Sequence, residues 1–153
     1  RRENLDAIVE AVKILSGETN VVIPLHPRTR AALLKRDLLT DIRESARVVE
    51  PASYLRMLSL ILGAKAVVSD SGGIPKEAFY LGIPSVTLRS EAIWTELVDL
   101  GWTRTVDPGS SESILSATRS ALQGDPGRPG QPYGDGTSAR LILDELIKRF
   151  AQA

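Results

Sequence analysis

The sequence predicts an α/β fold in which a doubly wound sheet of parallel strands is covered by helices on both faces. Short apolar, β-rich runs alternate with amphipathic helical patterns along the chain, and most runs end in a polar or glycine-containing turn. The length of 153 residues is enough for one buried core. Parallel strands need crossover connections, and helices in those connections bury both faces of the sheet.

The first part of the chain contains two such alternations. Leu5–Leu15 carries apolar residues on one helical face, and Gly17 favours the end of that helix. Val21–Leu25 is a short β-rich run, Ala31–Leu39 has a helical pattern, and Ala46–Val49 is a second apolar run. We therefore expect a helix, a strand, a helix and a strand in this order.

The alternation continues through the middle of the chain. Helices are predicted at Tyr54–Ile61 and Ile74–Leu81, because an apolar helical pattern or a proline at the first turn is followed by a closing glycine. The apolar runs Lys65–Ser69 and Ser85–Leu88 predict strands. Since a helix separates each strand from the next, the strands are expected to run parallel.

The last part of the chain changes in composition. A helix is predicted at Ile93–Leu100, a weak strand at Arg104–Val106 and a helix at Ser111–Leu122. Residues 123–137 contain five glycines and three prolines, which is typical of a loop, and a final helix is predicted at Ser138–Phe150.

The composition shift divides the chain into two units, a sheet-containing domain at residues 1–137 and a C-terminal helical segment at 138–153. The loop between the helices can serve as a hinge or tether. The chain begins Arg-Arg-Glu-Asn without a methionine, so we expect a piece of a longer or processed protein. The last helix would then dock on a part outside this sequence.

Composition excludes several function classes. The 19 basic and 19 acidic residues give no net charge and are dispersed, so we expect neither nucleic acid nor a membrane surface as a partner. The absence of cysteine and the single histidine exclude thiolate and multi-histidine metal sites, and we expect no metal and no cofactor. No apolar run approaches the roughly 18 residues of a membrane span, so we expect a cytoplasmic protein.

The turn Ser71-Gly72-Gly73 is the strongest candidate site. It follows a predicted strand and precedes a predicted helix with Pro75 near its first position, where backbone N–H groups and the helix dipole favour an anion. The alternative is a simple helix N-cap, with Asp70 or Ser71 capping and the glycines accommodating the turn. The residues alone leave both interpretations open.

Other polar residues are predicted at the same edge of the sheet. Glu77 lies one helical turn after Gly73 and can accept hydrogen bonds from ribose hydroxyls, or it can simply stabilise the helix dipole. His26 and Arg28 follow a strand, and His26 is alternatively a capping or packing residue. Arg89 follows another strand, with ordinary loop surface as its alternative.

Motifs in order along the whole chain resemble one family, the C-terminal domain of the UDP-N-acetylglucosamine 2-epimerases. They are RREN at 1–4, HPRT at 26–29, SDSGGIPKEA at 69–78, LGIPSVTLR at 81–89 and PYGDG at 132–136. The resemblance implies a Rossmann-like UDP-binding domain, the C-terminal half of a two-domain glycosyltransferase-B architecture. It further implies an isomerase of polysaccharide precursor synthesis, a homodimer when full length.

The resemblance also implies roles for particular residues. Ser71, Gly72 and Gly73 would hold the phosphates, Glu77 the ribose hydroxyls, and backbone near Met57 the uracil of a UDP-sugar. The reaction would expel UDP to give a 2-acetamidoglucal and re-add it with C2 inverted. The residues that move protons belong to the N-terminal domain in this family, so we expect no catalytic residue in this chain and no activity from it alone.

Two departures accompany the resemblance. Trp94 stands where many bacterial members carry an arginine near the phosphates, and LRSEAIWTELVDLGW at 88–102 is similar to a branch that includes enzymes acting on diacetamido uronic acid derivatives. The family's first, central strand would end just before Arg1. Its absence predicts a gap between the strands at 21–25 and 65–69, and an unstable isolated chain.

Overall fold

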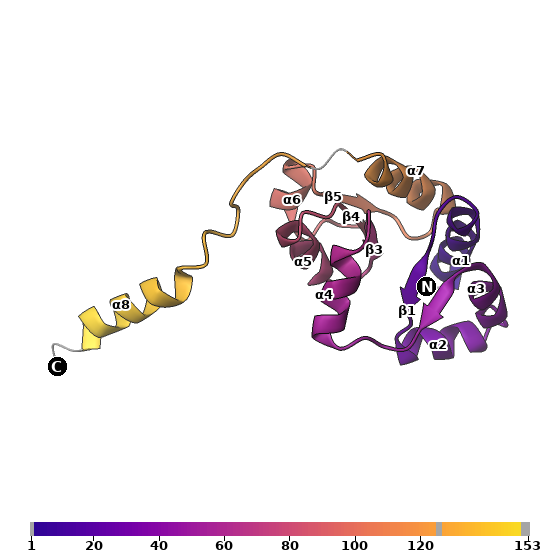
Figure 1. Cartoon of the computed structure of the whole chain (residues 1–153), viewed down its shortest axis with the longest axis horizontal. Helices are drawn as coiled ribbons and strands as arrows, with labels where there is room; N and C mark the ends of the chain where they lie inside the picture. The colour runs from indigo at the N-terminus through magenta and orange to yellow at the C-terminus, as the bar shows by residue number, and fades with distance from the viewer. Residues whose placement is uncertain (1, 125–126, 151–153) are drawn as a thin grey trace.

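The computed structural model describes residues 2–124 and 127–150, and its elements follow the predicted α/β order (Figure 1). Residues 1, 125–126 and 151–153, which include the outer ends of the predicted units 1–137 and 138–153, lie outside the described residues. In chain order the elements are α1 (Arg2–Ser16), β1 (Val22–Pro24), α2 (Pro27–Leu34), α3 (Leu39–Ser45), β2 (Arg47–Val49), α4 (Tyr54–Leu62), β3 (Val67–Ser69), α5 (Ile74–Tyr80), β4 (Ser85–Leu88), α6 (Thr95–Asp99), β5 (Thr103–Val106), α7 (Ser111–Leu122) and α8 (Ser138–Phe150).

The described strands form two separate parallel sheets. β1 pairs with β2, while β4 lies between β3 and β5. In the ranges that the structure describes, no strand pairing joins β1 to β3, so the predicted gap between these strands is confirmed. Val22 of β1 and Val68 of β3 are 43% and 38% exposed, which is unusual for valines in short strands of a doubly wound sheet. Each of these two strands therefore has an unpaired edge.

Helix α1 connects the two sheets through the core. Ala11 and Leu15 of α1 pack with Val86 of β4 in a cluster that also contains residues of α7. Val9 of the same helix packs with Leu25 and with residues of α2 and α3 in a second cluster beside β1. Because the apolar residues of α1 serve both clusters, this helix holds together sheets that share no backbone hydrogen bonds.

One predicted helix is wrong in its extent. The helix expected at Ala31–Leu39 is two helices, α2 and α3, and both extend beyond the predicted bounds. The chain turns at Asp37, which has a φ of 55°, a left-handed conformation that interrupts helical hydrogen bonding. The break lets Leu33 of α2 and Leu39 of α3 both reach the cluster beside β1.

The loop before α8 is fixed to the domain at its start. The N–H of Arg128 donates to the carbonyl of Leu100 at 2.7 Å, and Nε1 of Trp102 donates to the carbonyl of Arg128 at 2.9 Å. Beyond the loop, α8 extends away from the rest of the chain (Figure 1). Its large apolar side chains are all exposed: Leu141, Ile142, Leu143, Leu146, Ile147 and Phe150.

Replacing Gly127 by alanine is expected to release this loop. A Cβ at Gly127 would lie 2.6 Å from the carbonyl oxygen of Leu100 and from the backbone N of Trp102, so backbone must move. Overpacking of this kind costs about 1–3 kcal/mol. Urea unfolding of the full-length protein should show the loss, whereas Gly63→Ala, which meets only an ordinary 3.5 Å contact with Ser59, should not. Equal midpoints for the two variants would contradict the expectation.

Candidate functional site

The turn after β3 is built from serines and glycines that hydrogen-bond to one another. Ser69 Oγ accepts from the N–H of Ser71 at 3.1 Å, and Ser71 Oγ accepts from the N–H of Gly73 at 3.4 Å. Gly73 is the N-cap residue of α5. The predicted residues Ser71, Gly72 and Gly73 thus lie in one strand-to-helix turn, hereafter the Gly turn, at the kind of edge where doubly wound sheets bind ligands.

Neither glycine of the Gly turn is required by backbone conformation or by crowding. Gly73 has a φ of −84°, and Gly72 is not among the positive-φ glycines of the described residues. A Cβ at Gly72 would meet Ile93 at 3.8 Å, and one at Gly73 would meet Glu77 at 3.9 Å, both ordinary contacts. The idea that the glycines only accommodate the turn is therefore unsupported.

The start of α5 is also uncapped. The N-cap residue is Gly73, which provides no side-chain cap, so neither Asp70 nor Ser71 is the N-cap, although Ser71 Oγ accepts from the N–H of Gly73. Among the residues that the structure describes, none accepts a hydrogen bond from the N–H of Gly72 or Ile74. Pro75 has no N–H to satisfy. Two backbone donors beside the Ser71 hydroxyl are therefore available to a ligand.

Glu77 projects over the Gly turn from α5. Its Oε1 lies 3.9 Å from the position that a Cβ of Gly73 would occupy, and its N–H donates to the carbonyl of Gly73 at 3.3 Å. The side chain is half-buried. A carboxylate above the turn can accept hydrogen bonds from hydroxyls of a ligand whose anionic part is held below it.

Arg89 reaches the Gly turn from the end of β4. Its Nε and Nη2 donate to the carbonyl of Asp70 at 3.1 and 2.8 Å. Arg89 is exposed and has five N–H donors, so the fork can hold the backbone of the turn and still offer a donor to a ligand.

A cation and two aromatic rings lie beside the Gly turn, and sequence reasoning did not find them as a group. Lys76 Nζ is 3.7 Å from the ring centroid of Trp94 and 3.9 Å from that of Tyr133. The sequence singled out Trp94 only as a departure from the family it resembles, and it gave no signal for Lys76. In the structure Trp94 is half-buried. The contacts join residues far apart in the chain, so no local pattern could reveal them.

Tyr133 anchors the glycine-rich loop in this cluster. Its ring packs edge-on against Phe79 at 6.3 Å and Trp94 at 5.8 Å between centroids. Burial, with a smaller contribution from the negative charge of Glu96, raises the pKa of the Tyr133 hydroxyl. This hydroxyl is buried without a hydrogen-bond partner among the described residues. The phenol therefore stays neutral and contributes mainly its ring.

Met57 lies in the first turn of α4, where its N–H donates to the carbonyl of Ser53 at 2.8 Å. Its side chain is half-buried. Helix α4 packs against α5, the helix that follows the Gly turn. The structure thus puts the element that carries Met57 beside the element that carries Glu77.

His26 and Arg28 lie in a different part of the chain. His26 is the N-cap of α2, and its Nδ1 accepts from the N–H of Arg28 at 3.2 Å. Both residues are exposed and follow β1, in the sheet that is not joined to β3, and α2 is separated from α5 in Figure 1. The capping role considered for His26 is present, while a binding role for either residue stays a prediction.

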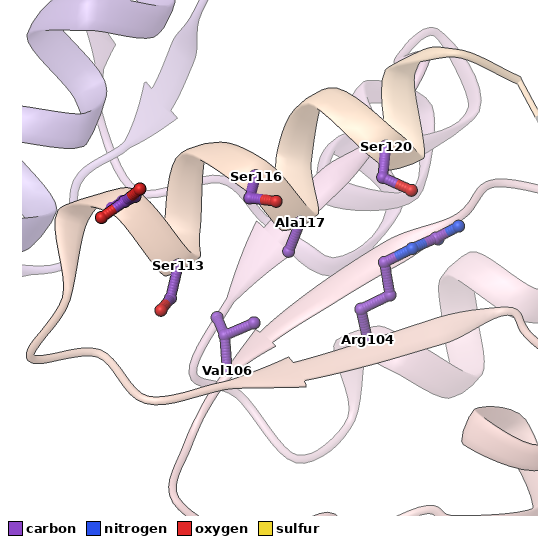
Figure 2. Close-up of a pocket in the computed structure, with 7 residues that line it drawn as sticks. Arg104, Val106, Ser113, Ser116, Ala117 and Ser120 are labelled. Atoms are coloured by element: carbon purple, nitrogen blue, oxygen red, sulfur yellow. The ribbon is translucent and has the colours of Figure 1, made fainter.

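Two cavities differ in their relation to these residues. One of about 430 Å³ lies at the ends of β4 and β5 and is lined by Arg89, Glu91, Asn4 and Asp107 among others. A second of about 550 Å³ lies between β5 and α7, where Arg104 faces a row of serines (Figure 2). The first adjoins the Gly turn through Arg89, and the second involves none of the predicted site residues.

In the part of the chain that the structure describes, no group of three or more acidic, histidine or cysteine side chains is arranged to hold a metal ion. No helix among these residues is long and apolar enough to cross a membrane. The arrangement at the Gly turn combines two backbone N–H groups without an acceptor among the described residues, the Ser71 hydroxyl, the Glu77 carboxylate and the Arg89 guanidinium.

A family model described as UDP-N-acetylglucosamine 2-epimerase matches residues 1–147 of the chain. A UDP-2,3-diacetamido-2,3-dideoxy-D-glucuronate 2-epimerase of Pseudomonas aeruginosa is 36% identical over 155 residues, covering 97% of this chain and 42% of that protein. A UDP-N-acetylglucosamine 2-epimerase homolog of Methanococcus maripaludis is 33% identical, covering 95% and 40%. The chain therefore spans about two fifths of the length of these relatives.

Solved structures have the same fold. The UDP-GlcNAc 2-epimerase of Methanocaldococcus jannaschii in complex with UDP-GlcNAc and UDP superposes with a TM-score of 0.85 at 28% identity, over 97% of this chain and 41% of that one. The enzyme of Neisseria meningitidis bound to UDP-GlcNAc gives a TM-score of 0.69 at 27% identity, over 94% and 41%. The doubly wound α/β prediction is confirmed at the level of fold.

Proposed function

Since the chain belongs to the UDP-N-acetylglucosamine 2-epimerase family, we propose that it is the UDP-binding C-terminal half of a nucleotide-sugar 2-epimerase. The observation that carries this proposal is the Gly turn. Its two glycines are needed neither for backbone conformation nor for space, and the N–H groups of Gly72 and Ile74 have no acceptor among the described residues. A diphosphate supplies oxygen acceptors of the right charge.

In this proposal different residues at and near the Gly turn bind different parts of the nucleotide. The Ser71 hydroxyl and the backbone of Gly72 and Gly73 bind the diphosphate. Glu77 accepts hydrogen bonds from the ribose hydroxyls, and backbone beside Met57 binds the uracil. The support is the position of Glu77 above the turn and the packing of α4 on α5.

Arg89, His26 and Arg28 complete the proposed substrate-binding residues. Arg89 is supported by its bidentate contact with the turn. His26 and Arg28 follow β1, at the carboxyl end of a parallel strand. They would contact the sugar or the phosphates only in the complete protein, with the substrate bound across the edges of both sheets.

The proposed reaction is an inversion at C2 of the sugar. A base removes the C2 proton while the C1–O bond to UDP breaks, which leaves a 2-acetamidoglucal and free UDP. Re-addition of UDP at C1, with a proton delivered to the opposite face of C2, gives the epimer. The chain described here would hold UDP in place between the two steps, and the groups that transfer protons would belong to the N-terminal half.

The sugar is proposed to be an acetamido sugar. The relative from Pseudomonas aeruginosa is a 2-epimerase of a diacetamido glucuronate nucleotide, and others are UDP-N-acetylglucosamine 2-epimerases. The segment at 88–102, which contains Trp94, is similar to the branch whose enzymes act on diacetamido uronic acid derivatives. We therefore propose UDP-N-acetylglucosamine or its 2,3-diacetamido uronic acid relative as substrate.

Proton exchange at C2 tests the proposed function. The full-length protein in deuterated water should replace the H2 signal of one of these two UDP-sugars by deuterium and produce a second anomeric signal, both visible by proton NMR. The matched reaction with residues 1–153 alone should show neither. If both sugars keep H2 while UDP binds, the epimerase assignment is wrong.

The same spectra separate the alternatives. Release of UDP with free N-acetylmannosamine indicates a hydrolysing epimerase, and transfer of the sugar to an added acceptor indicates a glycosyltransferase. Binding of a UDP-sugar without any change indicates a non-catalytic nucleotide-sugar sensor. Each of these results would replace the proposed epimerase activity and leave the proposed nucleotide-binding site in place.

We further propose that the exposed apolar residues of α8 pack on the N-terminal half and that the full-length protein is a homodimer acting in the cytoplasm in polysaccharide precursor synthesis. The support for the packing is that α8 lies apart from the other helices (Figure 1) and that its large apolar side chains are exposed. Light scattering of the full-length protein tests the dimer.

A further inference from the structure

The carbonyl of Gly72 is held by a side chain from another element. Trp94 immediately precedes α6, is half-buried, and its Nε1 donates to the carbonyl oxygen of Gly72 at 2.6 Å. This bond joins the middle of the Gly turn to a residue far along the chain.

The bond fixes more than one carbonyl. No described peptide bond is cis, so the C=O of Gly72 and the N–H of Gly73, which share one peptide plane, point in opposite directions. The carbonyl faces Trp94, and the N–H faces Ser71 Oγ at 3.4 Å. The N–H of Gly73 is thus turned to the same side as the Ser71 hydroxyl.

Two adjacent glycines do not hold such an orientation by themselves. Glycine has no Cβ to restrict φ and ψ, so the Gly72–Gly73 peptide can rotate at low cost in the absence of an external contact. A flipped peptide would turn the carbonyl of Gly72, with its partial negative charge, toward the site of an anion. The indole contact favours the orientation in which the carbonyl of Gly72 points away from that site.

The indole ring is itself held in place. The ammonium of Lys76 lies between the rings of Trp94 and Tyr133, 3.7 and 3.9 Å from their centroids. The two rings meet at 78° with their centroids 5.8 Å apart. Because Lys76 belongs to α5 and Tyr133 to the loop before α8, two other elements contact the ring of Trp94.

We propose that Trp94 is a positioning residue that orients the Gly72–Gly73 peptide for the UDP diphosphate, and that Lys76 and Tyr133 hold its indole ring. This inference rests on the proposed UDP site and adds to it the residues that determine its backbone orientation.

Trp94→Phe in the full-length protein removes the N–H donor and keeps an aromatic ring for Lys76. Loss of one hydrogen bond should raise the Kd for UDP about three- to tenfold by calorimetry. The matched control is Thr118→Val, which removes one side-chain hydrogen bond to a backbone carbonyl, that of Ile114 at 2.7 Å within α7, and leaves the Gly turn and the loop of Tyr133 untouched. The control should bind UDP as the unmodified protein does.

Two further measurements distinguish positioning from a general loss of structure. A positioning role raises the KM for the UDP-sugar, whereas partial unfolding lowers the apparent kcat and leaves KM unchanged. Deuterium uptake of a peptide covering residues 69–78 should increase in Trp94→Phe and stay unchanged in Thr118→Val. Lys76→Arg should retain affinity because it keeps a cation between the rings, and Lys76→Met should lose it.

The outcomes separate this inference from the proposed function. If the unmodified protein binds UDP and Trp94→Phe binds it equally well with unchanged KM, the positioning role is wrong and the UDP site stands. If the unmodified protein does not bind UDP, the proposed function fails, and with it the role of Trp94 toward a diphosphate. The deuterium uptake then still decides whether Trp94 orders the Gly turn.

Discussion

Replacing Glu77 by alanine is expected to weaken UDP binding to the full-length protein by roughly ten- to a hundredfold. The carboxylate lies above the Gly turn, half-buried, with Oε1 3.9 Å from the position of a Gly73 Cβ. Hydrogen bonds to a charged group contribute about 1.5–3 kcal/mol, and each 1.4 kcal/mol corresponds to about a tenfold change in Kd. Calorimetric titration with UDP measures the change directly.

The control must separate a ligand contact from a helix-dipole effect. Glu112 is an acidic residue in the first turn of α7, as Glu77 is in the first turn of α5. Glu112→Ala removes the same kind of dipole interaction at a site remote from the Gly turn, and should leave the Kd unchanged. An unaltered Kd in Glu77→Ala would limit Glu77 to the dipole role, worth a few tenths of a kcal/mol.

Residues 1–153 produced alone are expected not to give a monomer that melts cooperatively. Strands β1 and β3 each have an unpaired edge, Val22 and Val68 are exposed on them, and α8 exposes an apolar face. Unpaired strand edges and large apolar patches favour association between copies. Size-exclusion chromatography with light scattering should show oligomers or aggregate, and calorimetry should show no sharp transition.

The proposed two-domain protein is the control for this experiment, since its N-terminal half would cover these surfaces. It should give a defined species with a cooperative transition under the same conditions. A monomeric 1–153 chain with a cooperative melt at ordinary mesophile temperatures, near 45–65 °C, would contradict the expectation. In that case α1, which packs in both core clusters, is sufficient to hold the two sheets together.

The order of elements could be predicted because periodicity and turn residues are local properties of the sequence. The strand Ser85–Leu88 was predicted with the bounds that β4 has, since it is a continuous buried run. The division of the helix predicted at Ala31–Leu39 could not be predicted. Asp37 adopts a positive φ, which allows both α2 and α3 to reach the core. That choice depends on tertiary packing, which local propensity does not report.

The residues of the candidate site that are close in sequence could be predicted, and those that only the fold brings together could not. Ser71, Gly72, Gly73 and Glu77 are near one another in sequence, and the structure keeps them together at the start of α5. Trp94 is near them only because α6 follows β4, the strand that lies beside β3. The order of helices and strands along the sequence therefore does not predict this contact.

The contact of Tyr133 with Lys76 has a thermodynamic consequence for the detached helix. Tyr133 and α8 belong to one continuous segment, and Lys76 lies in the first turn of the helix that begins at the Gly turn. If docking of α8 displaces Tyr133 and thereby changes nucleotide affinity, then nucleotide binding changes the free energy of α8 docking by the same amount. Nucleotide binding and docking of the C-terminal helix would then be coupled equilibria, so that each changes when the other does.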